Sequence, residues 1–333
     1  MTVVEEVIKK YGALSIQRLG DASSLLVPVI PTGSLTLDLA LGTGGIPRGR
    51  ITEILGPFQG GKSTLCQHLV AQCQSFGGKA AFIDSEHALD TTWAETCGVD
   101  IAELWMSQPD YGEQALDIAA MIVKSAEFDL VIVDSVAALL PKAELEGELG
   151  DSHMALTARL MSQAMRKFAP IVKSSNTAVV FTNQLRKNIG ISWGNPEVTT
   201  GGEALKYYSS VRIDVRKRQD IKETAQTGKD PDIVGSTIKA RVIKNKVAPP
   251  FKIAEFVIMF DTGIDLATDV INLALLNNLI QKGGAGWFTM EMNGEEKKIQ
   301  GMNNLRKELM QEKELFLSVE NSVRATYGLP VKC

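Results

Sequence analysis

Short apolar segments and amphipathic segments alternate along the chain between residues 51 and 182. An apolar run at 51–55 leads into a glycine-rich turn, after which Leu65, Leu69 and Val70 recur at helical spacing. The order then repeats, predicting a strand at 79–84, a helix at 113–126, a strand at 128–134, a helix at 153–174 and a strand at 177–182. Strands that are apolar on both faces and alternate with helices are typical of a mostly parallel sheet covered by helices. We therefore predict an α/β fold.

The pattern changes after Val211, where apolar and polar residues alternate one by one. Residues 211–215, 238–242 and 253–260 follow this two-residue period, which predicts antiparallel strands at one edge of the sheet. Residues 217–235 are polar and rich in turn residues, so we predict a mobile surface loop there.

Segments at both ends of the chain fall outside this core pattern. Residues 3–11 have the period of a short amphipathic helix, and the stretch with Pro28 and Pro31 that follows suits an arm. Beyond Gly263, helices are predicted at 266–279 and 302–327, flanking an apolar segment at 287–290 and a turn at Asn293–Gly294. We therefore expect an arm over 1–30, a core over 31–262 and a small C-terminal α/β domain over 263–333.

The composition is that of an ordinary globular protein, with 44% apolar and 22% charged residues in 333. Residues 1–10 lack the basic-then-apolar pattern of a secretion signal and no membrane segment is evident, so we expect a cytoplasmic protein without membrane contact. The four cysteines show no Cys-x-x-Cys spacing and the chain has 3 histidines, which favours a reducing compartment and no zinc site.

Charge is distributed unevenly, which the net charge of -4 conceals. Residues 1–150 carry 9 Lys and Arg against 20 Asp and Glu, whereas residues 151–333 carry 26 against 19. Residues 159–218 hold 11 basic side chains and three acidic ones. This asymmetry favours an anionic partner, although a solvated surface explains the same charges.

Residues 56–63, Gly-Pro-Phe-Gln-Gly-Gly-Lys-Ser, match the P-loop pattern Gly-x-x-x-x-Gly-Lys-Ser/Thr between a predicted strand and a predicted helix. In such a loop, backbone N–H groups and the helix dipole hold phosphates, the lysine reaches the outer phosphates, and the hydroxyl ligates Mg²⁺. A chance glycine turn is the alternative. The residues predicted to bind nucleotide here are Gly56, Pro57, Phe58, Gln59, Gly60, Gly61, Lys62, Ser63 and Thr64.

Two acidic residues are candidates for chemistry beside the phosphates. Asp134 ends an apolar strand, where P-loop proteins place a carboxylate for Mg²⁺, so we predict that Ser63 and Asp134 hold the metal. An aspartate that only caps the next loop is the alternative. Glu86 lies just beyond the neighbouring strand end, where parallel sheets gather functional groups, and is a candidate for activating water. A surface glutamate in an ion pair explains Glu86 as well.

Several longer stretches resemble the bacterial RecA recombinases, in the same order and with similar separations. They are residues 56–63, 82–90, 131–138, 146–153, 183–184 and 244–246, and the resemblance runs from about residue 15 to beyond 260. It implies a RecA-like P-loop NTPase core, preceded by an N-terminal helical arm for oligomerisation. ATP and Mg²⁺ are the implied cofactors.

The resemblance also implies catalytic roles beside that of Lys62. Glu86 would activate the attacking water, and Gln184 would sense the γ-phosphate and couple it to a DNA loop. Lys244 and Lys246 would reach the ATP of the adjacent subunit, where cations stabilise the charge of a transferring phosphoryl group. Because they flank one residue of an alternating strand, both point to one face. Edge-strand lysines that discourage aggregation are the alternative.

The resemblance places DNA contacts in two loops. The first, residues 146–154, leads into a predicted helix, and the second, residues 186–202, mixes glycine, basic and large apolar residues. Such a loop suits a single strand, because amides and cations hold phosphates while an apolar side chain inserts between bases. A disordered surface loop is the alternative, although loops this long are usually functional. The predicted contacts are Met154, Arg159, Ser162, Arg166, Arg186, Ile189, Trp193, Thr200, Gly201 and Gly202.

The chain departs from the RecA pattern at several positions. Phe58 and Gln59 replace an acidic and a small residue, and Asn188 and Glu203 replace a lysine and an asparagine near the DNA path, which bears on DNA affinity. Asp90 and Trp93 are expected at the nucleotide, Trp93 stacking on adenine in place of the usual tyrosine. The acidic C-terminal tail common in the family is missing, so we expect no autoinhibition by it.

The resemblance implies a DNA-dependent ATPase that forms helical filaments on single-stranded DNA and pairs it with duplex DNA. Recombination, DNA repair and co-protease activity in the SOS response, with a LexA-like repressor as partner, follow from the same family. An oligomeric RecA-like ATP switch without strand exchange is the alternative that the altered P-loop keeps open. A hexameric helicase or circadian-type ATPase is disfavoured by the RecA-like loops.

Overall fold

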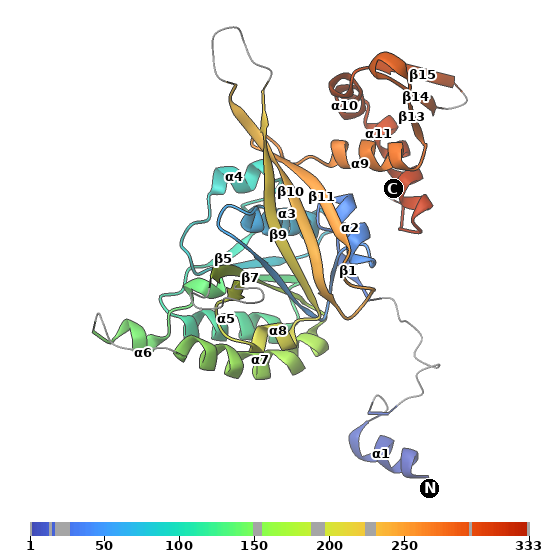
Figure 1. The fold of residues 1–333 in the computed structure, drawn as a ribbon. Helices are drawn as coiled ribbons and strands as arrows, with labels where there is room; N and C mark the ends of the chain where they lie inside the picture. The colour runs from blue at the N-terminus through green and yellow to red at the C-terminus, as the bar shows by residue number, and fades with distance from the viewer. Residues whose placement is uncertain are drawn as a thin grey trace.

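The computed structural model describes residues 2–12, 15–16, 27–148, 155–187, 197–223, 231–292 and 295–331. Within these ranges a large sheet is covered by helices, and a smaller unit with its own sheet lies at the C-terminal end (Figure 1). The predicted α/β class is confirmed.

The central sheet combines parallel strands with an antiparallel extension. Its strands are β3 (Ile51–Gly56), β4 (Ala80–Asp84), β5 (Trp105–Ser107), β6 (Leu130–Asp134), β7 (Ala178–Lys187), β8 (Glu197–Thr199), β9 (Val211–Lys222), β10 (Ile233–Asn245), β11 (Ile253–Met259) and β12 (Gly263–Ile264). They lie in the order β12-β11-β10-β9-β3-β7-β6-β4-β5, with β8 paired to β7. The six strands from β9 to β5 run parallel, whereas β10, β11 and β12 add antiparallel pairs at one edge, as predicted.

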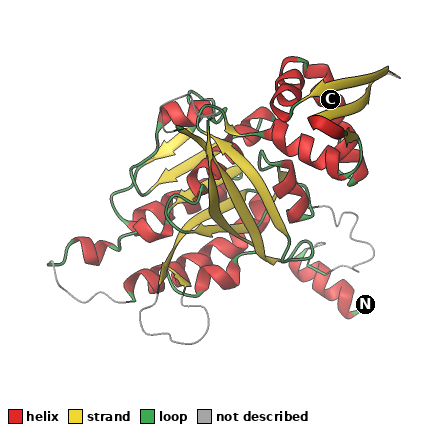
Figure 2. Ribbon diagram, turned by 45° about the horizontal axis from the view of Figure 1, so that its top comes forward, coloured by secondary structure: helices red, strands yellow, loops and turns green. Residues whose placement is uncertain are grey.

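Helices cover both faces of the parallel strands (Figure 2). α2 (Leu35–Leu41) and α3 (Lys62–Ser75) pack on one face, and α5 (Gly112–Ser125) and α7 (Leu156–Ser175) pack on the other. Because side chains alternate across a strand, Leu130 and Ile132 of β6 face α3 while Val131 and Val133 face α5 and α7. This two-sided burial is why these strands read as unbroken apolar runs. Shorter helices are α4 (Thr91–Thr96), α6 (Lys142–Leu145) and α8 (Ala204–Tyr208).

The predicted N-terminal helix is confirmed as α1 (Val3–Tyr11). The side chain of Thr2 accepts a hydrogen bond from the backbone N–H of Glu5, and the carboxylate of Glu5 accepts one from Thr2 in return, which caps the helix. None of its residues is buried. The chain then forms a two-stranded sheet of β1 (Val29–Ile30) and β2 (Ile46–Pro47). Among the helices of the described ranges, none has the length and apolarity that crossing a bilayer requires.

The C-terminal unit contains α9 (Leu266–Leu276), β13 (Ile280–Lys282), β14 (Trp287–Met292), β15 (Glu295–Gln300), α10 (Met302–Gln311) and α11 (Lys313–Thr326). Its apolar core includes Leu35 of α2, so the unit packs directly on the core domain. The hydroxyl of Ser34 donates a 2.5 Å hydrogen bond to Asp269 of α9 across this contact. The division of the chain at residues 30 and 262 stays a prediction.

Two predicted segments were wrong. The loop predicted over 217–235 is strand at both of its ends, because β9 extends to Lys222 and β10 begins at Ile233, and their pairing satisfies the backbone polar groups. The helix predicted over 302–327 is two helices, because Glu312 between them has a non-helical ψ of 87°. Residues 224–230 and the turn at Asn293–Gly294 lie outside the described residues.

Candidate nucleotide-binding site

The P-loop lies between β3 and α3 and passes close beneath β9. A Cβ atom at Gly56 would stand 2.1 Å from the carbonyl oxygen of Val215, and one at Gly60 would stand 2.7 Å from the same oxygen. Gly61 adopts a φ of +91°, which favours glycine. The glycines are therefore required by backbone contact with β9 and by the turn that begins α3.

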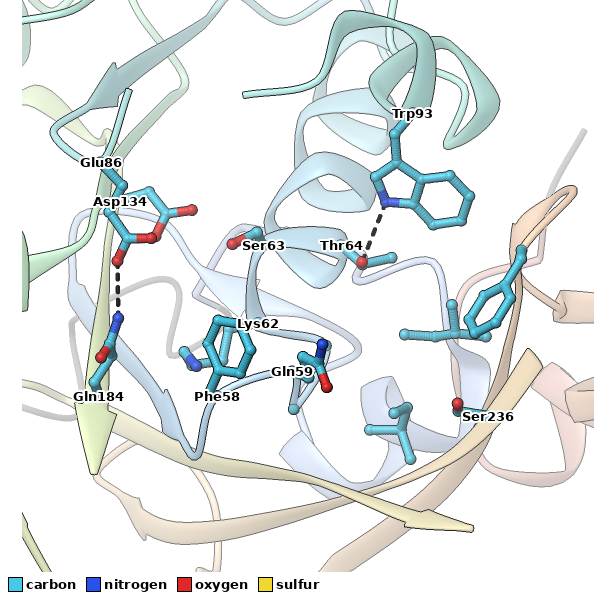
Figure 3. Close-up of a pocket in the computed structure, with 15 residues that line it drawn as sticks. Phe58, Gln59, Lys62, Ser63, Thr64, Glu86, Trp93, Asp134, Gln184 and Ser236 are labelled. Carbon is cyan, nitrogen blue, oxygen red and sulfur yellow. Dashed lines mark hydrogen bonds between the residues drawn. The ribbon is translucent and has the colours of Figure 1, made fainter. Parts of the chain in front are cut away.

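A cavity of about 470 Å³ opens beside this loop. The lining residues are Phe58, Gln59, Gly60, Gly61, Lys62, Ser63, Thr64, Glu86, Trp93, Asp134, Gln184, Ser236, Ile238, Ile258 and Phe260. Figure 3 shows Glu86, Asp134 and Gln184 on one side of the cavity and Trp93 on the other, with Ser63 and Thr64 between them. Residues predicted from separate strands and helices thus meet at one site.

Lys62 is held by the P-loop itself. Its Nζ donates hydrogen bonds to the carbonyl oxygens of Pro57, at 2.8 Å, and of Gly56, at 3.3 Å. Burial lowers the pKa of Lys62, and the carboxylates of Asp134 and Glu86 oppose that effect. A buried cation that donates to carbonyl oxygens is suited to an anionic ligand.

Asp134 provides a buried carboxylate next to a hydroxyl. It accepts hydrogen bonds from Thr182 and Ser63. Burial raises the pKa of Asp134, the two hydroxyls lower it, and the nearby Glu86 and Asp84 raise it. A cation here would relieve this concentration of negative charge. A carboxylate beside a hydroxyl fits Mg²⁺, because Mg²⁺ binds one or two carboxylates together with phosphates and water.

Glu86 is oriented by two neighbouring strands. One carboxylate oxygen accepts hydrogen bonds from the hydroxyl of Ser135, at 2.6 Å, and from Nε2 of Gln184, at 3.0 Å. Ser135 follows β6, and Gln184 lies within β7. The carboxylate therefore stands at the carboxyl ends of parallel strands, beside Asp134.

The far side of the cavity suits a nucleotide base. Nε1 of Trp93 donates a 3.3 Å hydrogen bond to the hydroxyl of Thr64. Asp90 does not line the cavity; its side chain caps α4 by accepting a hydrogen bond from the backbone N–H of Trp93 at 3.1 Å. Gly56 and Pro57 also contribute backbone contacts to Lys62 rather than cavity surface.

Sequence reasoning missed four lining residues that lie far from the P-loop along the chain. They are Ser236 and Ile238 of β10, Ile258 of β11, and Phe260. The alternating pattern marked their strands as half-buried, but it contained no sign of which cavity the buried face would reach.

Lys244 and Lys246 do not line the cavity of their own chain. Both Nζ atoms donate to the carbonyl oxygen of Tyr207, at 3.1 and 3.4 Å, so the two side chains do reach the same side of the sheet. Burial lowers the pKa of Lys244, and the positive charges of Lys246 and Arg212 lower it further, while Glu53 opposes them.

Comparison with known proteins agrees with this geometry. A family model described as the RecA N-terminal domain matches residues 1–265. The chain belongs to the RecA family. Similar proteins named RecA include those of Desulfotalea psychrophila, 49% identical over 98% of this chain and 89% of the relative, and Clostridium novyi, 49% identical over 99% and 91%. The RecA protein of Legionella pneumophila is 50% identical over 96% of this chain and 90% of its own length.

The residues that the RecA resemblance assigns to DNA lie partly on α7. Arg159 and Arg166 are exposed, and the hydroxyl of Ser162 donates to the carbonyl oxygen of Ala158 at 2.8 Å. Arg186 is exposed near the end of β7. Met154, Ile189 and Trp193, together with the substituted Asn188, lie outside the described residues.

The glycine pair after β8 packs against the same helix. A Cβ at Gly201 would stand 3.1 Å from Cγ of Met161 on α7 and 2.8 Å from Cγ1 of Val136 just after β6, and one at Gly202 would stand 2.9 Å from Cβ of Ala158 on α7. Both glycines have positive φ, so close packing and backbone shape account for them. The carbonyl oxygen of Thr200 accepts a 3.0 Å hydrogen bond from Asn183, which joins this segment to the strand that carries Gln184.

Among the departures from the RecA pattern, Phe58 and Gln59 line the cavity and Glu203 forms an ion pair. Phe58 lines the mouth of the cavity with 81% of its surface exposed. Glu203 is paired with Lys206 one helical turn away at 2.5 Å, so its charge is largely balanced locally.

Proposed function

We propose that the cavity beside the P-loop binds ATP with Mg²⁺ and hydrolyses it to ADP and phosphate. The observation that carries this proposal is the meeting of Lys62, Asp134, Glu86 and Gln184 around one cavity. The chain is a DNA-dependent ATPase and recombinase of the RecA family, and it acts in DNA recombination, DNA repair and the SOS response.

Each residue has a role that follows from its contacts. When phosphate binds, Lys62 exchanges its carbonyl partners for phosphate oxygens. The backbone N–H groups of residues 59–64 surround the phosphates. Ser63 and Asp134 hold Mg²⁺, which neutralises phosphate charge when bound. Glu86, held by Ser135 and Gln184, accepts a hydrogen bond from the attacking water. Gln184 contacts the γ-phosphate and couples its presence to the position of β7.

The base contacts the opposite wall of the cavity. Trp93 stacks on adenine, with Ile238, Ile258 and Phe260 as the remaining apolar surface. Asp90 supports this contact by capping the short helix that carries Trp93.

Lys244 and Lys246 complete the ATP site of the next subunit in a filament. They form a closely spaced, partly desolvated cation pair that stands outside its own cavity, and such a pair is stabilised by an anionic ligand. Self-association into a helical filament supplies the neighbour, and α1, which buries no residue within its own chain, is the arm that we assign to assembly.

DNA binds along α7 and the adjoining loops. Phosphate contacts are assigned to Arg159, Arg166 and Arg186, which are exposed, and to the half-buried Ser162. Thr200 and the glycine pair supply backbone groups. Met154, Ile189 and Trp193 complete the proposed contact set. Single-stranded and double-stranded DNA and a LexA-like repressor are the partners, in the cytoplasm.

ATP turnover measured with and without single-stranded DNA tests the proposal. We expect turnover to depend on DNA, and equal rates in both conditions would refute it. Formation of joint molecules between a single strand and a homologous duplex separates the recombinase from an ATP switch that only oligomerises.

A further inference from the structure

Glu53 is an acidic residue buried in the middle of the central sheet. It lies on β3, its side chain is 0% exposed, and it does not line the nucleotide cavity. Burying a carboxylate is costly unless other groups compensate its charge. The charge of Glu53 must therefore be compensated by neighbouring groups.

The two oxygens of Glu53 bind side chains from the strands on either side. Oε1 accepts a 3.0 Å hydrogen bond from Nδ2 of Asn183 on β7, and Oε2 accepts one of 2.5 Å from Nε of Arg212 on β9. Arg212 lies directly opposite Glu53 in the parallel register of β3 and β9. Glu53 thus joins β7 to β9 through side chains.

The Asn183 branch leads into the ATP site of the same subunit. Oδ1 of Asn183 accepts a 2.9 Å hydrogen bond from the backbone N–H of Gln184, whose Nε2 donates to Glu86. Nδ2 of Asn183 also donates to the carbonyl oxygen of Thr200 in the DNA-facing segment. Asn183 and Gln184 therefore link Glu53 to Glu86, the residue assigned to the attacking water.

The Arg212 branch leads to the lysine pair. Arg212 is paired with Lys244 in the antiparallel register of β9 and β10, and Lys246 follows just beyond the end of β10. Arg212, Lys244 and Lys246 place three positive charges together, and Glu53 is the negative charge that acts against their effect on Lys244. Main-chain carbonyls of α8 hold the two ammonium groups.

We infer that Glu53 is a positioning residue for ATP hydrolysis at the neighbouring subunit's site. It holds Arg212 and balances the positive charge of Arg212, Lys244 and Lys246, so that the two lysines stay placed to enter the next ATP site. Its hydrogen bond with Asn183 connects these basic residues to Gln184. This inference rests on the proposed function, in which the two lysines act across the subunit boundary.

Filaments of mixed composition test the inference. The variant Glu53→Gln keeps the shape of the side chain and an oxygen for Asn183, but it loses the charge that holds Arg212. We expect its filaments on single-stranded DNA to lose about tenfold or more in ATP turnover. Electron microscopy first establishes that each variant forms filaments.

The decisive measurement mixes Glu53→Gln with Glu86→Gln subunits. We expect Glu86→Gln subunits to lose turnover at their own site, but they present intact Glu53, Arg212 and lysines to a neighbour. Turnover by Glu53→Gln subunits should therefore recover in proportion to the sites that adjoin a Glu86→Gln subunit. Mixing with Lys244→Ala subunits should give no recovery, because those subunits lack one of the lysines.

A purely structural role for Glu53 would not produce recovery in one mixture and not in the other. Full turnover by Glu53→Gln alone, recovery in both mixtures, or recovery in neither would overturn the inference. If wild-type filaments showed no DNA-dependent ATP turnover, the proposed function itself would be refuted. The two failures are therefore distinguishable.

Two further variants control for folding. Glu320→Gln removes the acid of a buried ion pair with Arg324 in the C-terminal unit, and we expect it to leave turnover unchanged. If Glu53→Gln does not fold, Arg212→Lys keeps the charge but loses the guanidinium bond to Glu53. It should show the same pattern in both mixtures, and wild-type turnover by its filaments would contradict the inference.

Discussion

His68 should make stability depend on acid pH. It lies on α3, is 7% exposed, and its Nε2 accepts a 2.8 Å hydrogen bond from the backbone N–H of Ile264, next to the start of the C-terminal unit. An imidazole that accepts this bond must be neutral at Nε2. Burial accordingly lowers the pKa of His68 from 6.5 to about 4.

The magnitude follows from the two pKa values. Between them, the unfolded chain binds a proton more readily than the folded protein, so the stabilising contribution is fully present above pH 6.5 and is lost as pH falls toward 4. The difference between the two pKa values corresponds to about 3 kcal/mol in the free energy of unfolding. With an unfolding entropy of about 0.7 kcal/mol/K for a chain of this length, this loss lowers the Tm by about 4 °C.

The assay is thermal unfolding of the wild type and of His68→Gln from pH 7.5 to pH 4. Glutamine offers a carbonyl oxygen to Ile264 but does not titrate, so the Tm of the wild type should fall relative to that of the variant by about 4 °C as the pH is lowered. Other titrating groups are common to both proteins and cancel in the difference. Curves that stay parallel over this range would refute the reasoning.

Four further predictions concern single residues. Burial raises the pKa of Asp269 from 3.8 to about 6, so its contribution is fully present below pH 3.8 and is lost as pH rises through 6. As the pH rises from 4 to 7, the free energy of unfolding of Asp269→Asn should therefore increase by up to about 3 kcal/mol relative to that of the wild type. A difference in Tm between the two proteins that stays constant with pH would contradict this. Glu86→Gln should bind ATP normally but lose turnover by about 10²-fold or more, and retained turnover would exclude its role with water. Lys244→Ala should be defective only in assembled filaments, so an equal defect in dilute monomer would argue against action across subunits. Gly56→Ala should abolish ATP binding and destabilise the protein, because its Cβ meets the Val215 carbonyl, and normal binding in a titration with labelled ATP would disprove that.

Features encoded within a short stretch of chain were predictable from the sequence. The strand, glycine turn and helix around residues 51–75 depend on neighbouring residues alone, so motif and periodicity agree with the structure. The prediction failed at residues 217–222 and 233–235, where polar composition suggested a loop. There β9 and β10 form a long paired ribbon whose exposed side chains need not be apolar, so hydrophobicity contained no signal of the strands.

By itself the sequence determined the fold class, the P-loop and the acidic residues at the strand ends, because parallel strands bring their carboxyl ends to one edge of a sheet. Only the tertiary structure decided that Ser236 and Phe260 line the same cavity, and that Glu53 binds both Asn183 and Arg212. Asn183 and Arg212 each lie more than a hundred residues from Glu53 in the sequence, and their contact with it depends on strand order and register. Register is set by the packing of the whole sheet, which no single segment of the sequence specifies.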